Sequence, residues 1–188
     1  MSLRNAAHFE TNHVYRVMMK ERFKRTSFVN NPIDIDAVDR RLLALLQQDC
    51  ARTNLELAAE AHLSPATCLR RVRRLRESGL IEREMALLSP DRLAEAVGVG
   101  LTAILEVTLD RQDSATLEQF EVAVAGEAAV QQCYRVSAGP DFVLIIHVAD
   151  MPAYHALVQR ALTAERAVRN VRAFFSVRRS KFAPVLPV

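Results

Sequence analysis

A dense group of arginines marks the part of this chain where charged side chains are most concentrated. Residues 63–81 read LSPATCLRRVRRLRESGLI, with five arginines between Arg70 and Arg76. Guanidinium groups this close together repel one another in water and become favourable beside a polyanion. Arginine matches both phosphate groups and the O6/N7 edge of guanine in the DNA major groove. A solvated basic helix face is the alternative interpretation, and the surrounding sequence decides between the two.

The arginine group lies on a predicted helix whose two ends are both marked. Ser64 is a favourable N-cap, Pro65 suits the first helical position, and Gly79 suits the position just past the end. Helical spacing places three apolar residues on an inner side, with Cys68 at its edge: Leu69, Val72 and Leu75. The outer side then carries Ala66, Thr67, Arg70 and Arg74. Arg71 and Arg73 lie on its flanks.

Two shorter helices are predicted immediately before this one. Asp34 or Asp36 can cap a helix that runs to about Gln48, with apolar residues at helical spacing. Asn54 can cap a second helix, which ends near Ala61 and is followed by a tight turn into the arginine helix. Three short helices of which the last is basic form a helix-turn-helix arrangement, which presents a recognition helix to the major groove. DNA binding is therefore favoured over a merely solvated basic face.

The second half of the chain has a different periodicity. Strands are predicted at residues 99–109, 130–138, 142–148 and 171–181, and helices at residues 114–126 and 151–162. This βαββαβ order is that of a ferredoxin-like unit, with both helices on one face of an antiparallel sheet. The uncovered face would expose Ile104, Cys133, Ile145 and Phe175, or their neighbours one position away. Self-association is the simplest way to bury such a face.

Composition excludes several other classes of protein. The chain has 188 residues and a net charge of +3, and no apolar run approaches the ~20 residues needed to span a bilayer. With no secretory signal either, we expect a cytoplasmic protein. The three cysteines form no CxxC, and the five histidines share no ligand spacing with cysteines or acids, so no metal site is expected. We found no GxSxG, Walker or GxGxxG motif, and we expect no cofactor.

Four motifs occur in order along the chain: Asp36-x-x-Asp39-x-x-Leu42-Leu43, Asn54-x-Glu56-Leu57-Ala58, the LSPATCLRRVRRLRESGLI segment and Leu87-Leu88-Ser89-Pro90. Together they resemble the leucine-responsive and asparagine-operon regulators, the Lrp/AsnC family. The resemblance covers the chain from about Ile33 to its end and is closest to the leucine-responsive branch. One departure is Ala66-Thr67, where that branch usually reads Thr-Pro. The resemblance implies paired C-terminal sheets in a homodimer, with dimers assembling into higher oligomers, often octamers.

The same resemblance implies a site for a small effector, usually an amino acid, at the loop between the second and third strands. The corresponding segment here begins at Val136, and its candidate effector-binding residues are Ser137, Ala138, Gly139, Pro140, Asp141 and Phe142. Backbone N–H groups in such a turn can hold a carboxylate, and Asp141 could take an α-ammonium group. The family commonly has glycine and then an acid where this chain has Ala138 and Gly139. The alternative is that Gly139-Pro140-Asp141 is only a hairpin turn.

We therefore interpret the sequence as an α+β DNA-binding transcriptional regulator. The expected domains are a basic N-terminal arm (residues 1–32), a plain or winged helix-turn-helix domain (residues 33–96, with the motif at about 54–73), a ferredoxin-like domain (residues 97–182) and a tail (residues 183–188). Arg70 and Arg74 are expected to face the groove of double-stranded DNA beside Ala66 and Thr67. Contacts to phosphates are expected from Arg71, Arg73 and the Ser64-Pro65 end of the helix.

Two alternatives remain open from the sequence. One is an architectural DNA-binding protein with weak sequence preference, associated with the nucleoid. The other is an enzyme that resembles the siroheme decarboxylases, which share the two-domain layout. An enzyme of that kind has no reason to keep a row of arginines facing a DNA groove, so the regulator is favoured.

Overall fold

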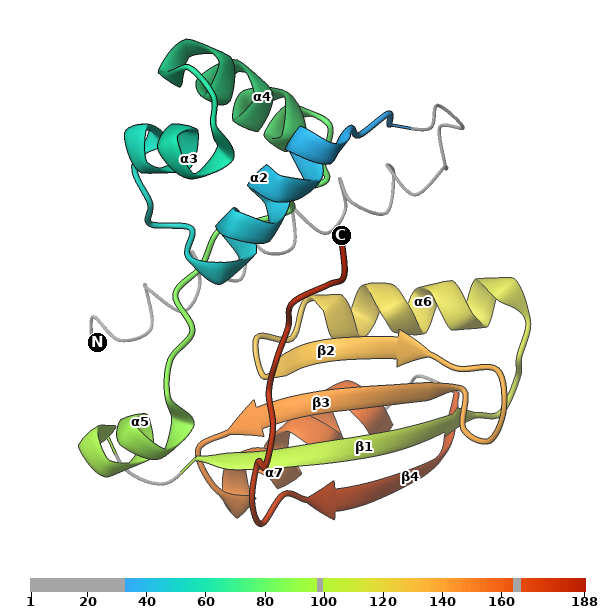
Figure 1. The fold of residues 1–188 in the computed structure, drawn as a ribbon. Helices are drawn as coiled ribbons and strands as arrows, with labels where there is room; N and C mark the ends of the chain where they lie inside the picture. Colours follow the sequence, from blue (N-terminus) through green and yellow to red (C-terminus); the bar gives the residue numbers. More distant parts are fainter. Residues whose placement is uncertain (1–32, 98–99, 164–166) are drawn as a thin grey trace, which may run out of the picture. The chain divides into compact units, whose positions relative to one another are not determined.

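The computed structural model describes residues 33–97, 100–163 and 167–188. The predicted N-terminal arm, residues 1–32, lies outside the described residues. The chain divides into two compact units (Figure 1). One contains Ser89–Arg179, and the other combines Asn30–Leu88 with the C-terminal segment Ser180–Val188. Each unit is described by itself.

The helix-turn-helix unit is built from three helices, α2 (Ala37–Gln48), α3 (Asn54–Ala61) and α4 (Pro65–Glu77). Asp36 caps α2 in a capping box with Asp39, and Ser64 caps α4, with Pro65 in its first turn. The prediction that Asn54 caps α3 is wrong, because Thr53 is the cap and forms the box with Glu56. The turn into α4 is tight because His62 adopts a left-handed conformation (φ 57°).

The core of this unit shows that α4 is rotated relative to the predicted orientation. Cys68, Val72 and Leu75 are buried, whereas Leu69 is 57% exposed. Leu69 was expected on the inner side with Cys68 at the edge, so this assignment is wrong. The stripe at i, i+4 and i+7 from Cys68 buries a compact thiol together with two apolar side chains, against leucines and alanines of α2 and α3.

The second unit begins with α5 (Pro90–Val97) and continues as the expected βαββαβ fold. Its elements are β1 (Leu101–Leu109), α6 (Ser114–Ala125), β2 (Val130–Arg135), β3 (Phe142–Val148), α7 (Met151–Val158) with a π-helical turn η1 (Gln159–Thr163), and β4 (Val168–Phe175). The antiparallel sheet has the order β2-β3-β1-β4, so β1 and β3 are central. The ferredoxin-like prediction is confirmed.

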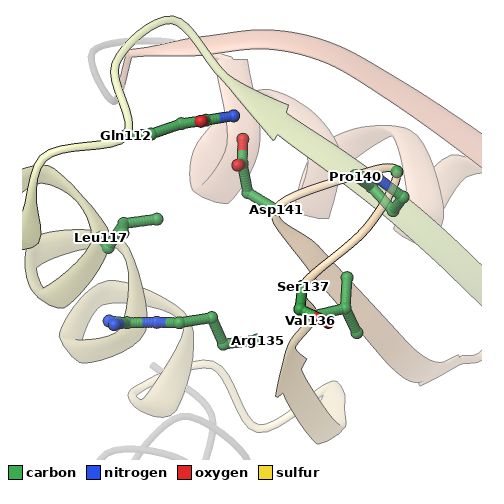
Figure 2. A pocket seen from close by; sticks show the side chains of 8 residues that line it. Gln112, Leu117, Arg135, Val136, Ser137, Pro140 and Asp141 are labelled. Carbon is green, nitrogen blue, oxygen red and sulfur yellow. The ribbon is translucent and has the colours of Figure 1, made fainter.

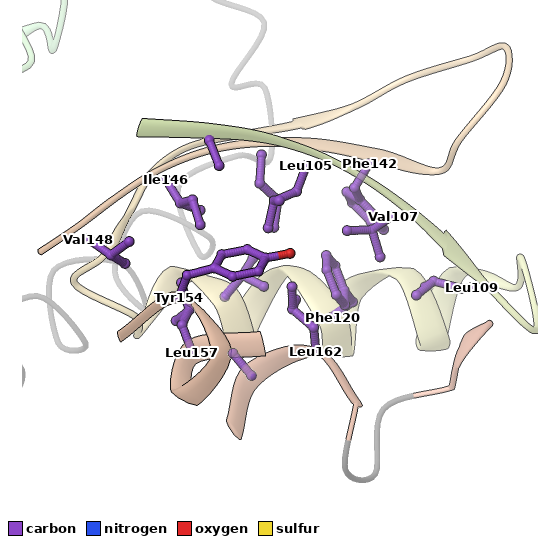
Figure 3. Packing of buried hydrophobic residues seen from close by; sticks show 14 residues of the cluster. Leu105, Val107, Leu109, Phe120, Phe142, Ile146, Val148, Tyr154, Leu157 and Leu162 are labelled. Atoms are coloured by element: carbon purple, nitrogen blue, oxygen red, sulfur yellow. The ribbon is translucent and has the colours of Figure 1, made fainter. Parts of the chain in front are cut away.

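One face of this sheet and the two long helices enclose the core (Figure 3). Phe120 of α6 packs on Phe142 of β3 with ring centroids 4.6 Å apart, and both side chains are buried. Tyr154 of α7 meets Phe175 of β4 edge to face at 5.1 Å. The alternating burial of β3 fixes its register, because a slip by one residue would turn every core side chain to the other face.

The predicted ends of β2 and β4 differ from the observed ones. β2 stops at Arg135 instead of residue 138, because Val136 donates its N–H to the carbonyl of Asp141 and starts the turn there. β4 begins at Val168 and ends at Phe175, earlier at both ends than predicted. Between α4 and α5, residues 80–88 form no strand and connect the two units. Asp113 caps α6.

The open face of the sheet carries apolar side chains, as expected, but two of the predicted residues lie on the other face. Ile104 pairs with Ile145 and Phe174, and Ile104 and Phe174 are exposed. Phe175 pairs with buried Ala103, and Cys133 pairs with buried Leu144, so both belong to the helix-covered side. Their neighbours Phe174 and Tyr134 take the predicted places on the open face, one position away.

Candidate nucleic-acid interface and ligand site

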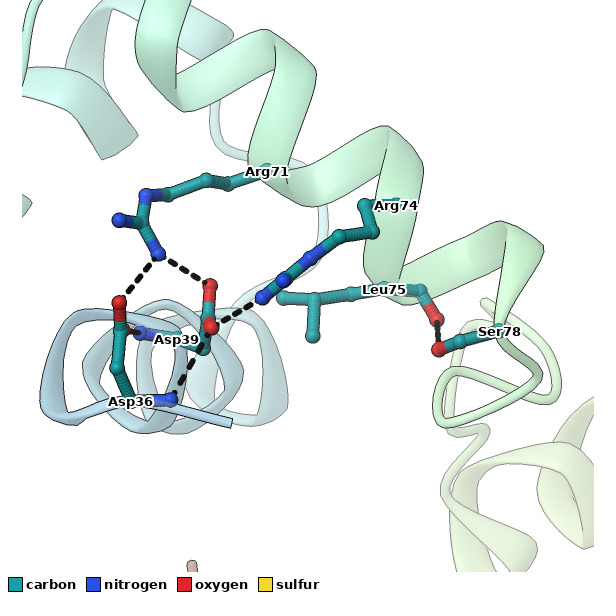
Figure 4. A network of polar contacts seen from close by, with 6 residues as sticks. All are labelled: Asp36, Asp39, Arg71, Arg74, Leu75 and Ser78. Atoms are coloured by element: carbon teal, nitrogen blue, oxygen red, sulfur yellow. Dashed lines mark hydrogen bonds and ion pairs between the residues drawn. The ribbon is translucent and has the colours of Figure 1, made fainter. Parts of the chain in front are cut away.

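A buried carboxylate holds the recognition helix α4 to α2 (Figure 4). The side chain of Asp39 is only 1% exposed. Its Oδ1 accepts a hydrogen bond from Nη1 of Arg71 at 2.9 Å, and its Oδ2 accepts one from Nη2 of Arg74. The same nitrogen of Arg71 also reaches Oδ2 of Asp36 at 2.8 Å. Two successive turns of α4 are thus fastened to the first turn of α2.

Two members of this cluster, Asp36 and Arg71, have pKa values shifted in the direction that favours their charged forms. The N–H of Asp39, followed by the guanidinium of Arg71, holds the pKa of Asp36 below its usual value. Hydrogen bonds to Asp36 and Asp39 raise the pKa of Arg71. Because the folded-state pKa of Asp36 is depressed, its contribution to stability is present at neutral pH. That contribution is lost as the pH falls through the folded-state value.

Four of the five guanidiniums of α4, which would repel one another in water, are paired with acids. Besides Arg71 and Arg74, Arg73 pairs with Glu77 at 2.7 Å and Arg76 with Glu84 at 2.6 Å. Arg70 is exposed, and its side chain has no ion pair or hydrogen bond among the described residues. The pair of Arg73 and Glu77 is itself exposed, at 77% and 63%, and such surface pairs exchange partners at little cost.

The start of α4 presents further polar groups on the exposed side. Ser64 accepts a hydrogen bond from the N–H of Thr67 as the N-cap and also donates its hydroxyl to Oγ1 of Thr67 at 2.9 Å. The side chain of Asn54 at the start of α3 donates to the carbonyl of Pro65 at 2.9 Å, so the first turns of the two helices are joined. Ser64, Pro65 and Ala66 are exposed, and Thr67 is partly buried.

The outer side of α4 is therefore different from the one predicted. With Cys68, Val72 and Leu75 inward, the opposite line carries Ala66, Arg70 and Arg73. Arg74 lies toward α2, where Asp39 holds it, and Leu69 lies toward the other side. From helical spacing alone, Arg74 was predicted to face the groove and Arg71 to lie on the flank of the outer side. The buried acid that draws both of them toward α2 was not recognised from the sequence.

A hollow of about 240 Å³ lies beside the turn between β2 and β3 (Figure 2). Four of the six predicted effector residues line it, namely Ser137, Gly139, Pro140 and Asp141. Val136, the first residue of the predicted segment, also lines it, and the structure adds three residues that sequence reasoning did not identify, namely Gln112, Leu117 and Arg135. Gly139 has a φ of +90°, a conformation that disfavours any residue with a side chain. Ala138 and Phe142 do not line the hollow, and Phe142 is part of the core.

The polar groups around the hollow are partly engaged within the protein. Asp141 is 8% exposed, and its Oδ2 accepts the N–H of Leu109 at 2.7 Å. Arg135 pairs with Glu121 at 2.9 Å and lies over the ring of Phe142. Figure 2 shows Gln112 and the carboxylate of Asp141 pointing toward each other. Asp141 thus supports the turn, and its other oxygen has no hydrogen bond among the described residues.

The described residues contain no group of three or more histidines, cysteines or acids placed to hold a metal ion. In the same part of the chain, no helix is long and apolar enough to cross a bilayer.

A tight helix-turn-helix with an exposed basic face, followed by a separate α+β unit, defines a two-domain DNA-binding regulator. Comparison with known families agrees. Residues 35–76 match the AsnC-type helix-turn-helix domain, and residues 102–186 match the Lrp/AsnC ligand binding domain. The chain belongs to the Lrp/AsnC family of transcriptional regulators.

Individual relatives are similar over most of their length. An HTH-type transcriptional regulator of Haemophilus influenzae is 38% identical over 155 residues, which is 81% of this chain and 90% of the relative. The leucine-responsive regulatory protein of Escherichia coli is 38% identical over 141 residues, 75% of this chain and 84% of that protein. Among solved structures, a transcriptional regulator from Neisseria meningitidis in complex with L-Met superposes with a TM-score of 0.71 at 30% identity. This superposition covers 82% of this chain and 97% of the Neisseria meningitidis protein.

Proposed function

We propose that this regulator reads DNA chiefly through Arg70, with Ala66 and Arg73 beside it. The observation that supports this most directly is the state of Arg70, which is exposed, faces away from the core and is paired with no acid among the described residues. A guanidinium of this kind can bind guanine O6 and N7 in the major groove. Arg73 can leave its exposed pair with Glu77 for a phosphate.

The remaining predicted residues receive narrower roles in this proposal. Ser64, Pro65 and Thr67 stand at the N-terminus of α4, where backbone N–H groups and the helix dipole favour a phosphate. Arg71 is mostly enclosed and bonded to two carboxylates, so it positions the helix. Arg74 is half exposed and can add a phosphate contact while it remains on Asp39.

Replacement of Arg70 by alanine tests the proposed base contact. We expect a loss of about 1–3 kcal/mol at the base pair that Arg70 reads and a relaxed preference there. The measurement is competition binding at one stated salt concentration, with a site selected from a random DNA pool and its single-base variants. Arg76→Ala is the matched control, because Arg76 is on the same helix and is paired with Glu84. Unchanged affinity and unchanged site preference in Arg70→Ala would contradict the assignment.

We also propose that the hollow beside Ser137 and Asp141 holds a free amino acid. The match to the Lrp/AsnC ligand binding domain and the similarity to a regulator crystallised with L-Met support this proposal. The unbonded carboxylate oxygen of Asp141 could accept an α-ammonium group, and the side chain of Gln112 could bind a carboxylate. At about 240 Å³ the hollow suits a ligand smaller than a typical drug, whose pockets span roughly 300–1,000 Å³.

Filling the hollow should abolish amino-acid binding without disturbing the fold. Ser137→Phe places a ring in the hollow from an exposed position, whereas Ala138→Phe adds the same ring to the next residue, which does not line it. Titration calorimetry against the twenty amino acids, one at a time, should show heat of binding for at least one of them. We expect that signal to be lost in Ser137→Phe and kept in Ala138→Phe. Equal binding by both variants would place the ligand elsewhere.

For the assembly, we propose a homodimer that buries the open sheet face around Ile104 and Phe174, and further association to an octamer. The exposed apolar side chains of that face support the dimer, and the family resemblance supports the octamer.

A regulator of this kind acts on the chromosome, so we place it in the cytoplasm with the nucleoid. The relatives are transcriptional regulators, and we infer that this chain is likewise no enzyme. An architectural role predicts no enriched sequence in the pool selection.

A further inference from the structure

The C-terminal segment Ser180–Val188 belongs to the same compact unit as the helix-turn-helix helices. One side chain of α2 accounts for a specific contact between them. Nε2 of Gln47 donates to the carbonyl oxygen of Leu186 at 3.0 Å, and the N–H of Leu186 donates to Oε1 of Gln47 at 2.7 Å. A single side-chain amide thus engages both backbone groups of one residue, as a neighbouring strand does in an antiparallel sheet.

The sequence around Leu186 is suited to this contact. Pro184 and Pro187 flank the pair Val185-Leu186. A proline disfavours the helical conformation in the residue before it, so Pro187 biases Leu186 toward the extended backbone. In that conformation the N–H and carbonyl of one residue point to the same side and can meet one amide. The prolines therefore restrict the free segment to conformations close to the bound one, which lowers the entropy lost on docking.

Within the described residues, the chain passes from one unit to the other at Leu88–Ser89 and again at Arg179–Ser180. With the C-terminal segment docked on α2, both of these connections attach the helix-turn-helix domain to the ligand-binding domain. Two attachments allow less relative motion than one flexible connection.

We propose that Ser180–Val188 is a tether that docks on α2 of its own chain through Gln47 and Leu186. It restricts how far the helix-turn-helix domain can move relative to the ligand-binding domain. In an oligomer, this restriction limits the spacings of DNA half-sites that two recognition helices can occupy together. The docking is independent of DNA, and the effect on spacing rests on the DNA-binding function proposed above.

The absence of tryptophan from this chain allows a direct test of docking. Leu186→Trp introduces a unique fluorophore at a side chain that is 71% exposed, so the two backbone hydrogen bonds can persist. In the full-length protein, time-resolved anisotropy should show little nanosecond segmental motion of this tryptophan. Adding Gln47→Glu removes the donor to the Leu186 carbonyl and should release the motion.

The matched control for docking is Gln48→Glu in the same background. It makes the same change of charge on the next residue of α2, which is exposed and whose side chain makes no hydrogen bond among the described residues. This variant should leave the tryptophan immobile. Equal mobility of the tryptophan in the parent and in the Gln47→Glu protein would overturn the tether. An equal increase of tryptophan mobility in the Gln47→Glu and Gln48→Glu proteins would also overturn the tether.

The effect on half-site spacing is tested with paired half-sites taken from the selected DNA. One set keeps the selected spacing, and the other shifts one half-site by about half a helical turn, ~5 bp. The unmodified chain should prefer the selected spacing. Gln47→Glu, and a chain ending at Arg179, should reduce that preference by roughly tenfold, with single half-site affinity unchanged.

The outcomes separate the tether from the DNA-binding proposal. An unchanged spacing preference in both variants would overturn the restriction even if the anisotropy shows docking. If the unmodified chain bound no DNA, the proposed DNA-binding function would fail, and the anisotropy result would still decide whether the segment docks.

Discussion

Asp39→Asn is expected to lower the free energy of unfolding of the helix-turn-helix unit by about 3 kcal/mol. The change keeps the size of the side chain but leaves Arg71 and Arg74 facing a neutral amide. Arg71 is the more affected partner, since its side chain is 23% exposed and its Nε is already buried without a hydrogen-bond partner. Removal of one member of a buried ion pair costs 3–5 kcal/mol in typical cases. We expect the lower end because Arg74 is half exposed and can be solvated.

Urea denaturation followed by circular dichroism measures this loss, with the transition of the three-helix unit assigned by its helical signal. Asp34→Asn is the matched control, because it removes the same charge from an exposed residue five positions earlier on the chain. That control should change stability by less than about 0.5 kcal/mol. Equal stability of the Asp39→Asn and Asp34→Asn proteins would show that the cluster in Figure 4 contributes nothing measurable.

A double-mutant cycle of Asp39→Asn with Arg71→Met separates the pair from its surroundings. Once Arg71 is replaced by an apolar side chain, the buried carboxylate keeps Arg74 as its cationic partner and the N–H of Asp36, so the further cost of Asp39→Asn should be smaller. A coupling energy of about 0.5–3 kcal/mol between the two positions is expected for groups in direct contact.

The sequence identified the ends of the elements that carry local signals. Ser64 and Pro65 mark the start of α4 by backbone chemistry that depends on no distant residue, and both were assigned correctly. The predicted bounds of β3, residues 142–148 on the far side of the Gly139-Pro140-Asp141 turn, are also those of the structure. Caps are less certain where two candidates are adjacent, as with Thr53 and Asn54, because only the hydrogen bond distinguishes them.

The orientation of α4 was harder to predict because its sequence fits two stripes. Leu69, Val72 and Leu75 form one, and Cys68, Val72 and Leu75 form the other. The two stripes differ only in whether Leu69 or Cys68 is buried. Leucine is the more apolar of the two residues, yet the compact thiol of Cys68 is the one that is buried. Packing against the small residues Ala58 and Ala61 of α3 decides between the stripes, and a pattern within one helix carries no information about that partner.

The role of Asp39 has a signal in the sequence that we did not use. Asp39 lies at helical spacing from Leu42 and Leu46, on the buried stripe of α2, where an acid must find partners. Arginine was the only abundant cation on the helices nearby, so an acid on that stripe indicates an internal pair. The tether has no such signal, because it depends on a contact between residues 139 positions apart.

Phe142→Ala is expected to destabilise the ligand-binding unit by about 3–5 kcal/mol. Phe142 is the last of the predicted effector residues, yet its side chain is fully buried and its ring packs on Phe120. The deletion removes both the burial of a large apolar side chain and this aromatic contact, and it leaves a cavity between β3 and α6. Scanning calorimetry should show a lower transition temperature for this unit, with the helix-turn-helix transition unchanged.

Val122→Ala provides the control for this change, because Val122 is also apolar but lies on α6 with its side chain 52% exposed. It should change the transition by far less, since little apolar surface is removed from the core. The two roles considered for Phe142 predict different results. A residue that contacts ligand should reduce amino-acid binding with little change in stability. A core residue should lower stability first and reduce binding only to the extent that the unit unfolds. Full stability of Phe142→Ala combined with lost binding would therefore return Phe142 to the ligand site.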